Sequence, residues 1–270
     1  MRILLLLLAL PLWAADDVDA IIKRAIEAQR QNDPRAQQYT FVQQTQHLTL
    51  NKAGEAHETS SATHEVIFVE GLKYQKLVAR NGKPLNAKEA AQVETAMRQT
   101  AEDRRKHVHE GPVGGVVSMN GFFTHKSADL GSLGELLTLF ANRVTGEEEI
   151  RGHKAWVVES IPTPGYMPAS AHEKDVRGFR KRFWFDRADG NPVRAVYTVD
   201  AEEMFLTPGS TIAFEYDKID PETWQPVSIL FEFAAKKEKV YRPTGQTIYH
   251  MDQFRKFNVQ STITVTSTDK

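Results

Sequence analysis

Histidine is the side chain of this sequence with the widest choice of chemistry, because the chain has no cysteine. His107 and His109 alternate, so an extended segment would place both on one face, and His125 or His172 could supply a third metal ligand. His107 also closes a basic run that starts at Arg104, and cations suit the C-terminal end of a helix. Because the sequence places no third ligand, we favour a solvated basic helix end, and we expect neither a metal ion nor a cofactor.

The spacings of common catalytic motifs are incomplete. A zinc-protease helix would need a second histidine four residues after His172, and that position is Val176. Residues 131–134 hold a serine between glycines but lack the spacing of a nucleophile elbow. We therefore expect a protein that is not an enzyme, and a metal-dependent hydrolase that uses His107, His109 or His172 is the third of three hypotheses.

The composition limits the classes of protein that fit. The chain has 270 residues and a formal net charge of -1, which gives no overall attraction for nucleic acid. The absence of cysteine excludes disulfides, thiolate catalysis, cysteine-ligated zinc and lipid attachment through an N-terminal cysteine. The length is sufficient for one large domain with a hydrophobic core of its own.

The first fourteen residues have the pattern of a secretory signal peptide. Arg2 precedes an apolar run over residues 3–12 that is too short to span a bilayer, and the small residues Ala14 and Ala15 suit a cleavage site. A retained membrane anchor is the alternative interpretation of the same run. We expect cleavage after Ala14, so that residues 15–270 form a single domain that is soluble in the periplasm or is secreted.

Alternating apolar residues predict strands over most of the chain. Residues 182–199 are the clearest case, since two alternating runs flank Asp189-Gly190, a pair that tolerates the positive φ of a hairpin turn. A helix over residues 16–30, ended by Asp33-Pro34, precedes a three-stranded meander. The strands expected outside this hairpin are residues 39–50, 57–70, 72–80, 154–161, 211–219, 224–235 and 248–266.

Two helices interrupt the strands. The first covers residues 86–107, with Asn86 as its N-cap, and has only a thin apolar stripe. The second opens at Ser132 and carries apolar residues at helical spacing as far as Val144, so it must pack on the sheet. A large sheet tends to curl, and these two helices and the N-terminal helix are available to cover its curled face.

Two further segments suggest movement. Residues 111–120 are rich in glycine and precede the second helix, so they could act as a hinge that lets this helix swing away from the sheet and admit an apolar ligand. Residues 162–178 contain three prolines and predict a long loop. Loops of this length without secondary structure are usually mobile or functional.

The order of these elements resembles the periplasmic outer-membrane lipoprotein carriers and lipoprotein-sorting proteins, the LolA/LolB-like superfamily. The resemblance rests on the opening strand YTFVQQTQ, the helix pair over residues 86–144, the hairpin FWFDRADGNPVRAV and the terminal strand FRKFNVQSTITV. It covers most of the chain after the signal peptide and includes no catalytic motif. It implies an α+β fold in which a large curved antiparallel β-sheet, a half-open barrel, is covered by an N-terminal helix and two central helices that form a lid over a hydrophobic cavity for acyl chains.

We therefore expect a carrier or binding protein that holds a lipid or a lipidated polypeptide in an apolar cavity between sheet and helices. Its partners would be lipid or lipoprotein acyl chains, with an envelope membrane protein as a further partner. An envelope interaction or scaffold protein, in which the same apolar residues fill the core, is the alternative hypothesis. The residues that could line the cavity are Phe122, Phe123, Leu136, Leu137, Phe140, Trp156, Trp184, Phe231 and Phe233.

Overall fold

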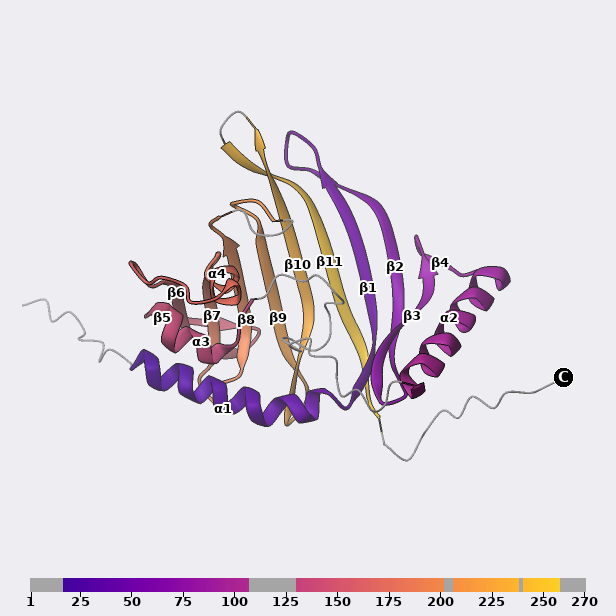
Figure 1. Ribbon diagram of the computed structural model, residues 1–270, viewed down its shortest axis with the longest axis horizontal. Helices are drawn as coiled ribbons and strands as arrows, with labels where there is room; N and C mark the ends of the chain where they lie inside the picture. The colour runs from indigo at the N-terminus through magenta and orange to yellow at the C-terminus, as the bar shows by residue number, and fades with distance from the viewer. Residues whose placement is uncertain (1–16, 107–129, 202–205, 238–239, 258–270) are drawn as a thin grey trace, which may run out of the picture.

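The computed structural model describes residues 17–106, 130–201, 206–237 and 240–257. Its strands form one sheet of eleven strands in the order β4-β3-β2-β1-β11-β10-β9-β8-β7-β6-β5 (Figure 1). The helices are α1 (Val18–Ala36), α2 (Ala87–Lys106), α3 (Leu133–Leu139) and α4 (Ala171–Val176). The strands are β1 (Tyr39–Leu50), β2 (Ala56–Val69), β3 (Leu72–Arg80), β4 (Lys83–Pro84), β5 (Phe140–Ile150), β6 (His153–Pro162), β7 (Phe179–Asp186), β8 (Pro192–Val199), β9 (Thr211–Asp220), β10 (Thr223–Lys237) and β11 (Val240–Lys256).

The sheet is open, with β4 at one edge and β5 at the other. Every neighbouring pair of strands is antiparallel, and most pairs are consecutive in the chain. The exception is the pair of β1 and β11, which runs from Tyr39 opposite Lys256 to Thr49 opposite Gly245. The first and the last strand of the chain therefore lie side by side in the middle of the sheet. The expected α+β fold with a large curved antiparallel sheet is confirmed.

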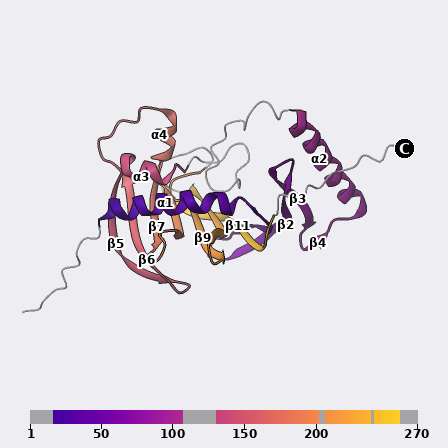
Figure 2. The ribbon, with the colours of Figure 1, turned by 90° about the horizontal axis from the view of Figure 1, so that it is seen from below.

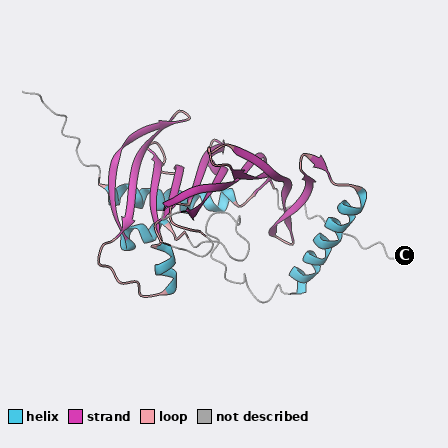
Figure 3. Ribbon diagram, turned by 90° about the horizontal axis from the view of Figure 1, so that it is seen from above, coloured by secondary structure: helices cyan, strands magenta, loops and turns pink. Residues whose placement is uncertain are grey.

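The two faces of the sheet are covered differently. Phe183 of β7 and Tyr216 of β9 line a pocket together with residues of α1 and α3, so both helices lie on one face, which we call the inner face. The sheet curves toward this side (Figure 3). Direct cross-strand partners share a face, and the other side of the sheet is the outer face. The partners that continue the inner face across the sheet are Phe183, Ala195, Phe214, Ile229, Tyr249, Thr45 and Ala62.

Helix α1 extends beyond its expected end. Asp17 caps it, accepting a hydrogen bond from the Asp19 amide at 3.1 Å. Pro34 lies inside the last turn, so the prediction that Asp33-Pro34 ends the helix is wrong. The last turn is held from outside, because the Asn32 side chain exchanges two hydrogen bonds with the backbone of Trp224. These contacts offset the backbone hydrogen bond that proline cannot donate.

Helix α3 is shorter than expected. Its N-terminus agrees with the prediction, since the Ser132 amide donates to the Glu135 carboxylate at 2.6 Å. The helix ends at Leu139, however, and the residues from Phe140 to Val144 belong to strand β5, so the predicted continuation to Val144 is wrong. The spacing of the apolar residues in this segment fits the period of a helix and also that of a strand. Pairing with β6 over ten residue pairs stabilises the strand.

Helix α2 packs against the outer face at the β2–β3 edge of the sheet (Figure 2). Its Arg104 guanidinium lies 6.0 Å from the ring centroid of Tyr74. The ammonium of Lys73, the residue before Tyr74 on β3, lies over the ring of Phe41 on the inner face. Neighbouring residues of a strand point to opposite faces, so Tyr74 lies on the outer face, and α2 and α1 cover opposite faces of the sheet. The expected N-cap at Asn86 is confirmed by a 3.0 Å hydrogen bond from the amide three residues on. Among the described helices, none has the length and apolar character needed to cross a membrane.

The core fills the inner face beneath α1 and α3. Tyr197 of β8 packs edge-on against Phe183 and Phe214, with ring centroids 5.8 Å apart in both contacts. Helix α1 contributes Ile22 and Ala25, which are fully buried. Each fully buried large apolar side chain contributes about 1.5–3 kcal/mol relative to an exposed one. The protein's own side chains therefore occupy this half of the inner face.

The segment over residues 162–178 is only partly a loop, because α4 forms inside it. Arg177 holds it to the sheet by donating to the carbonyl oxygens of Leu139 at 2.8 Å, Thr163 at 2.9 Å and Tyr166 at 3.4 Å. Its guanidinium also lies 4.9 Å from the ring centroid of Tyr166. One side chain therefore brings a charged donor to three backbone carbonyl groups, two of which also accept a backbone hydrogen bond.

We predict that Arg177→Met lowers the free energy of unfolding by about 2–4 kcal/mol, because several partly buried carbonyl groups lose a charged donor. Urea denaturation followed by circular dichroism measures this change. Lys174→Met, at an exposed position of α4, removes the same charge and should change stability by less than about 0.5 kcal/mol. Equal stability of the two variants would refute the role given to Arg177.

Candidate functional site

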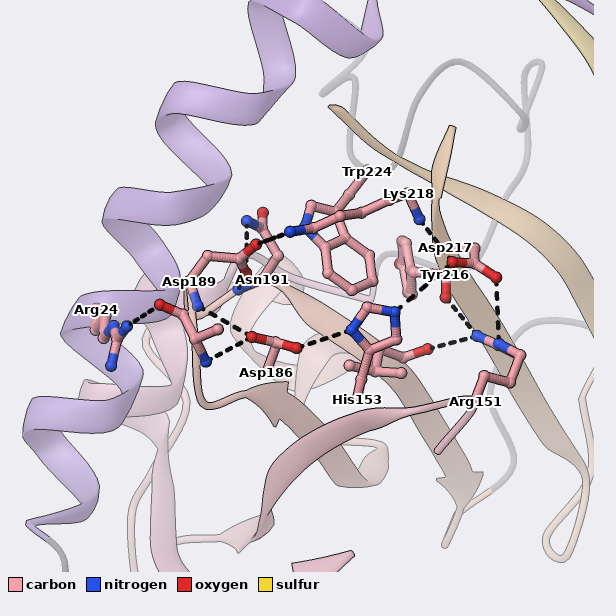
Figure 4. Close-up of polar contacts among 12 residues, drawn as sticks. Arg24, Arg151, His153, Asp186, Asp189, Asn191, Tyr216, Asp217, Lys218 and Trp224 are labelled. Atoms are coloured by element: carbon pink, nitrogen blue, oxygen red, sulfur yellow. Dashed lines mark hydrogen bonds and ion pairs between the residues drawn. The ribbon is translucent and has the colours of Figure 1, made fainter. Parts of the chain in front are cut away.

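A group of polar contacts ties α1 to the ends of several strands (Figure 4). Arg24 of α1 donates to a carbonyl oxygen in the β7–β8 turn at 2.6 Å. Asp189 of the same turn accepts hydrogen bonds from Trp224 Nε1 at 2.9 Å and from Lys218 Nζ, 3.0 Å away. Burial raises the pKa of Asp189, but hydrogen bonds from the backbone of Asn191 and from these side chains outweigh it, so the net pKa is lowered. The carboxylate is therefore held in its charged form and ties the β7–β8 turn to β9 and β10.

His153 lies in the same group, and the sequence analysis missed it. Its Nδ1 lies 3.0 Å from Asp186 Oδ2, and its Nε2 lies 3.8 Å from Asp217 Oδ1. Its ring packs on Trp224 with centroids 4.8 Å apart. A histidine–aspartate pair orients the general base of many hydrolases. Here the second ring nitrogen also faces a carboxylate, so we interpret His153 as a structural junction rather than a base presented to a nucleophile.

The pocket between α1, α3 and the sheet is small. Asp33 of α1 and Tyr216 of β9 face it, and burial raises the pKa of both groups. Its volume is about 60 Å³, which leaves room for a few water molecules, whereas pockets for small organic ligands hold about 300–1,000 Å³. This pocket, as the described residues form it, is therefore too small to be the apolar cavity expected between the sheet and the second central helix.

The expected cavity residues are only partly brought together. Phe122 and Phe123 lie outside the described residues. Six others belong to the core or pack against it, but they are spread over α3, β5, β6 and β10, and their part in ligand binding stays a prediction. These six are Leu136, Leu137, Phe140, Trp156, Phe231 and Phe233.

Trp184 is separated from the other expected residues. It alternates on β7 with Phe183 and Phe185, so it lies on the outer face. The guanidinium groups of Arg182 and Arg194 lie 5.0 and 5.4 Å from its ring centroids. This arrangement covers the indole with two cations on the side of the sheet away from α1.

The inner face changes from apolar to polar across the sheet. On β10 and β11 it carries Phe231, Phe233 and Tyr249, and the Phe231 ring lies 6.3 Å from Phe233 and 5.9 Å from Tyr249. On β1 and β2 the same face carries Gln43 and His64, which are direct cross-strand partners. The described helix that packs on β2 and β3 is α2, which does so from the outer face. The polar part of the inner face is therefore away from all four described helices.

Lys73 is a buried cation on this polar part of the inner face. Its ammonium lies 5.4 Å from the ring centroid of Phe41, and its cross-strand partner is Phe68. Within the part of the chain that the structure describes, its Nζ has no hydrogen-bond acceptor. Burial lowers the pKa of Lys73 to about 8, so the amine is still protonated at pH 7. The site holds a positive charge against the ring of Phe41, and no carboxylate of the described residues forms an ion pair with it.

Gln43 and His64 each add a buried polar atom that has no hydrogen-bond partner among the described residues. Gln43 Nε2 donates to Thr45 Oγ1 at 3.3 Å, but its Oε1 is buried and accepts no hydrogen bond from the described residues. His64 Nδ1 is likewise buried and has no hydrogen-bond partner in the described part of the chain. Burial lowers the pKa of His64, and the charge of Arg80 lowers it further, so the neutral ring is favoured. We call Gln43, His64 and Lys73 the polar patch.

The histidines that the sequence analysis considers as metal ligands are described only in part. His107, His109 and His125 lie outside the described residues, and His172 Nε2 lies 2.5 Å from Glu135 Oε1. Burial raises the pKa of Glu135, but hydrogen bonds from Ser132 and His172 outweigh it and lower the net pKa. The pair links α4 to α3. Over the four described ranges, no group of three or more potential metal ligands is found.

No protein-family model matches the sequence, and no curated protein matches it. Among solved structures, the chain is similar to a LolA superfamily protein from Nitrosomonas europaea, with 10% identity, a TM-score of 0.34 and coverage of 89% of this chain and 93% of that one. It is also similar to an outer membrane lipoprotein-sorting protein domain from Vibrio parahaemolyticus (12% identity, TM-score 0.40, coverage 88% and 93%). A DUF1329 family protein from Desulfovibrio piger matches at 13% identity and a TM-score of 0.38, with coverage of 92% and 96%. The superfamily that the sequence resembles is thus among the solved structures to which the chain is similar.

Proposed function

We propose that this protein is a carrier or binding protein that holds the acyl chain of a lipid or of a lipidated polypeptide against the inner face of its sheet. The observation that carries the proposal is the row of aromatic side chains on β10 and β11. This row extends the apolar core across the inner face toward the strands that carry the polar patch. Phe231, Phe233 and Tyr249 form this row. Phe233 and Tyr249 are only partly buried, so part of their apolar surface is available to a ligand.

The mechanism of binding is burial without covalent chemistry. Each methylene group that leaves water contributes about 0.8 kcal/mol, so a chain of eight or more carbons supplies enough free energy for specific binding. The pocket under α1 is too small for such a chain. The acyl chain therefore lies on the aromatic row and extends toward β1, and its release requires the apolar surface to be exposed again.

A signal peptide over residues 1–14 would place this activity outside the cytoplasm. An acyl chain that leaves one membrane for another needs a protein that shields it from water in between. The partners that fit are lipid or lipoprotein acyl chains and an envelope membrane protein that exchanges them.

Native mass spectrometry of the protein purified from an envelope extract tests the proposal. We expect a bound acyl ligand, or the uptake of added dodecanol with one molecule per chain. Protein that is consistently empty and that also ignores added dodecanol would rule out the carrier function.

The small volume of the pocket under α1 favours a second candidate function. If the whole interior is filled by the protein's own side chains, as it is beneath α1 and α3, the chain would be an envelope interaction protein that binds a partner through its surface. This candidate predicts a specific protein partner in pull-down experiments together with no acyl ligand in the mass spectrum.

A further inference from the structure

The polar patch contains three buried polar atoms without hydrogen-bond partners in the described part of the chain, namely Gln43 Oε1, His64 Nδ1 and Lys73 Nζ. Gln43 and His64 are direct partners across β1 and β2. Lys73 reaches over Phe41, which precedes Gln43 by two residues on the same face, a rise of about 7 Å along the strand. The three atoms therefore gather on one small area of the inner face.

This patch is costly for the fold taken alone. A buried cation without a carboxylate and a buried acceptor without a donor each destabilise the folded state. The neighbouring lysine on the same strand differs in this respect, because Lys76, on the outer face, forms an ion pair with Glu94 of α2. The described residues supply a carboxylate to the lysine on one face of β3 and none to the lysine on the other.

We propose that Lys73, with His64 and Gln43 beside it, binds the anionic head group of an amphiphile whose acyl chain lies along the aromatic row. This inference rests on the proposed carrier function and names the class of its ligand. An ammonium group has three donors and no acceptor, so carboxylate or phosphate oxygens satisfy it. The imidazole nitrogen and the glutamine side chain, whose amide can turn, supply further hydrogen bonds to the same group.

The position of the patch fits such a ligand. The sheet order places β10, β11, β1, β2 and β3 side by side, so Phe231 and Lys73 are four strand spacings apart across the sheet, roughly 19 Å, and the strand register also offsets them along the strands. The face between them runs from aromatic residues to polar ones. An amphiphile whose tail lies toward Tyr249 of β11 and whose head group lies beside Phe41, where the Lys73 ammonium is, matches this polarity, whereas a neutral lipid leaves the charge of Lys73 unpaired.

Binding of three probes to the full chain tests the inference, with dodecanoate as the anionic amphiphile, dodecanol as its neutral analogue and acetate as the free anion. Loss of a charged hydrogen bond predicts roughly 10- to 100-fold weaker binding of dodecanoate to Lys73→Met, with dodecanol binding unchanged. Lys73→Arg keeps the charge and should bind dodecanoate within about threefold of the wild type. Lys76→Met removes a charge from the outer face of the same strand and should leave both affinities unchanged.

The outcomes separate this inference from the carrier function. If dodecanol binds and dodecanoate binds equally well to wild type and Lys73→Met, the acyl site stands and the head-group site is refuted. If acetate alone binds as tightly as dodecanoate, the patch binds a free anion and the inference is wrong. If neither dodecanol nor dodecanoate binds to any variant whose circular dichroism is that of the wild type, both proposals fail.

Discussion

Replacing Lys73 with methionine is expected to raise the free energy of unfolding at pH 7 by about 2–3 kcal/mol. Burial lowers the pKa of Lys73 from 10.5 to about 8, and each pKa unit corresponds to about 1.4 kcal/mol. The attraction of the ammonium for the Phe41 ring, which the variant loses, offsets part of this gain. For a domain of this size the change should raise the melting temperature by about 4–10 °C.

The pH dependence of this effect follows from linkage. The folded state binds the Lys73 proton less tightly than the unfolded state, so the penalty is fully present below pH 8. Between about pH 8 and 10.5 the folded protein releases the proton while the unfolded chain keeps it, and wild-type stability rises toward that of the variant. Above that range the Lys73 amine is neutral in both the folded and the unfolded state, and its burial no longer lowers the free energy of unfolding through its charge.

Urea denaturation of the wild type and Lys73→Met at pH 7, 8.5 and 10 measures this convergence. Lys76→Met is the matched control, because its lysine forms an ion pair with Glu94, and we expect it to destabilise the protein by less than about 1 kcal/mol at each pH. A Lys73→Met protein that is less stable than the wild type at pH 7 would show that the ammonium has a partner in the folded state.

Replacing Phe233 with glutamate is expected to weaken the binding of dodecanol at least tenfold. Phe233 stacks on Phe231 with ring centroids 6.3 Å apart and is partly buried on the inner face. A carboxylate at this position must be desolvated when an acyl chain lies over it, which costs more than about 1.4 kcal/mol, the equivalent of tenfold in affinity. Isothermal titration calorimetry or native mass spectrometry measures the change.

Leu230→Glu is the control for this variant. Leu230 precedes Phe231 on β10, so its side chain lies on the outer face, and it is partly buried like Phe233. The same charge on the same strand should then leave dodecanol binding within about threefold of the wild type. Equal losses in both variants would mean that the ligand does not distinguish the two faces.

Much of the fold could be predicted from the sequence because most strands alternate cleanly. The hairpin of β7 and β8 has apolar residues at alternate positions, with Lys181 as the exception, and a glycine with φ +84° at Gly190 in its turn. The boundary between α3 and β5 could not be predicted, because Phe140 and Val144 fit a helical stripe and also a strand face. Pairing with β6, which lies later in the chain, decides between them.

The site was less predictable than the fold. The change from Phe41 to Gln43 and Thr45 on one strand face is a visible signal that an apolar face becomes polar. Lys73 has no such signal, because a single lysine in a strand is usually exposed. Its burial depends on Phe41, which lies 32 residues earlier and meets it only after β1, β2 and β3 have paired.

The pairing of β1 with β11 has a consequence for how the protein folds. Gln44 lies opposite His250, so the centre of the sheet joins residues about 200 positions apart, and such non-local contacts slow folding. The pairing cannot begin until the last strand has been synthesised, and until then the edge of β1 lacks its neighbour. The complete sheet therefore cannot form until synthesis of the chain is nearly complete, and the two groups of strands on either side of this pairing stay separate until then.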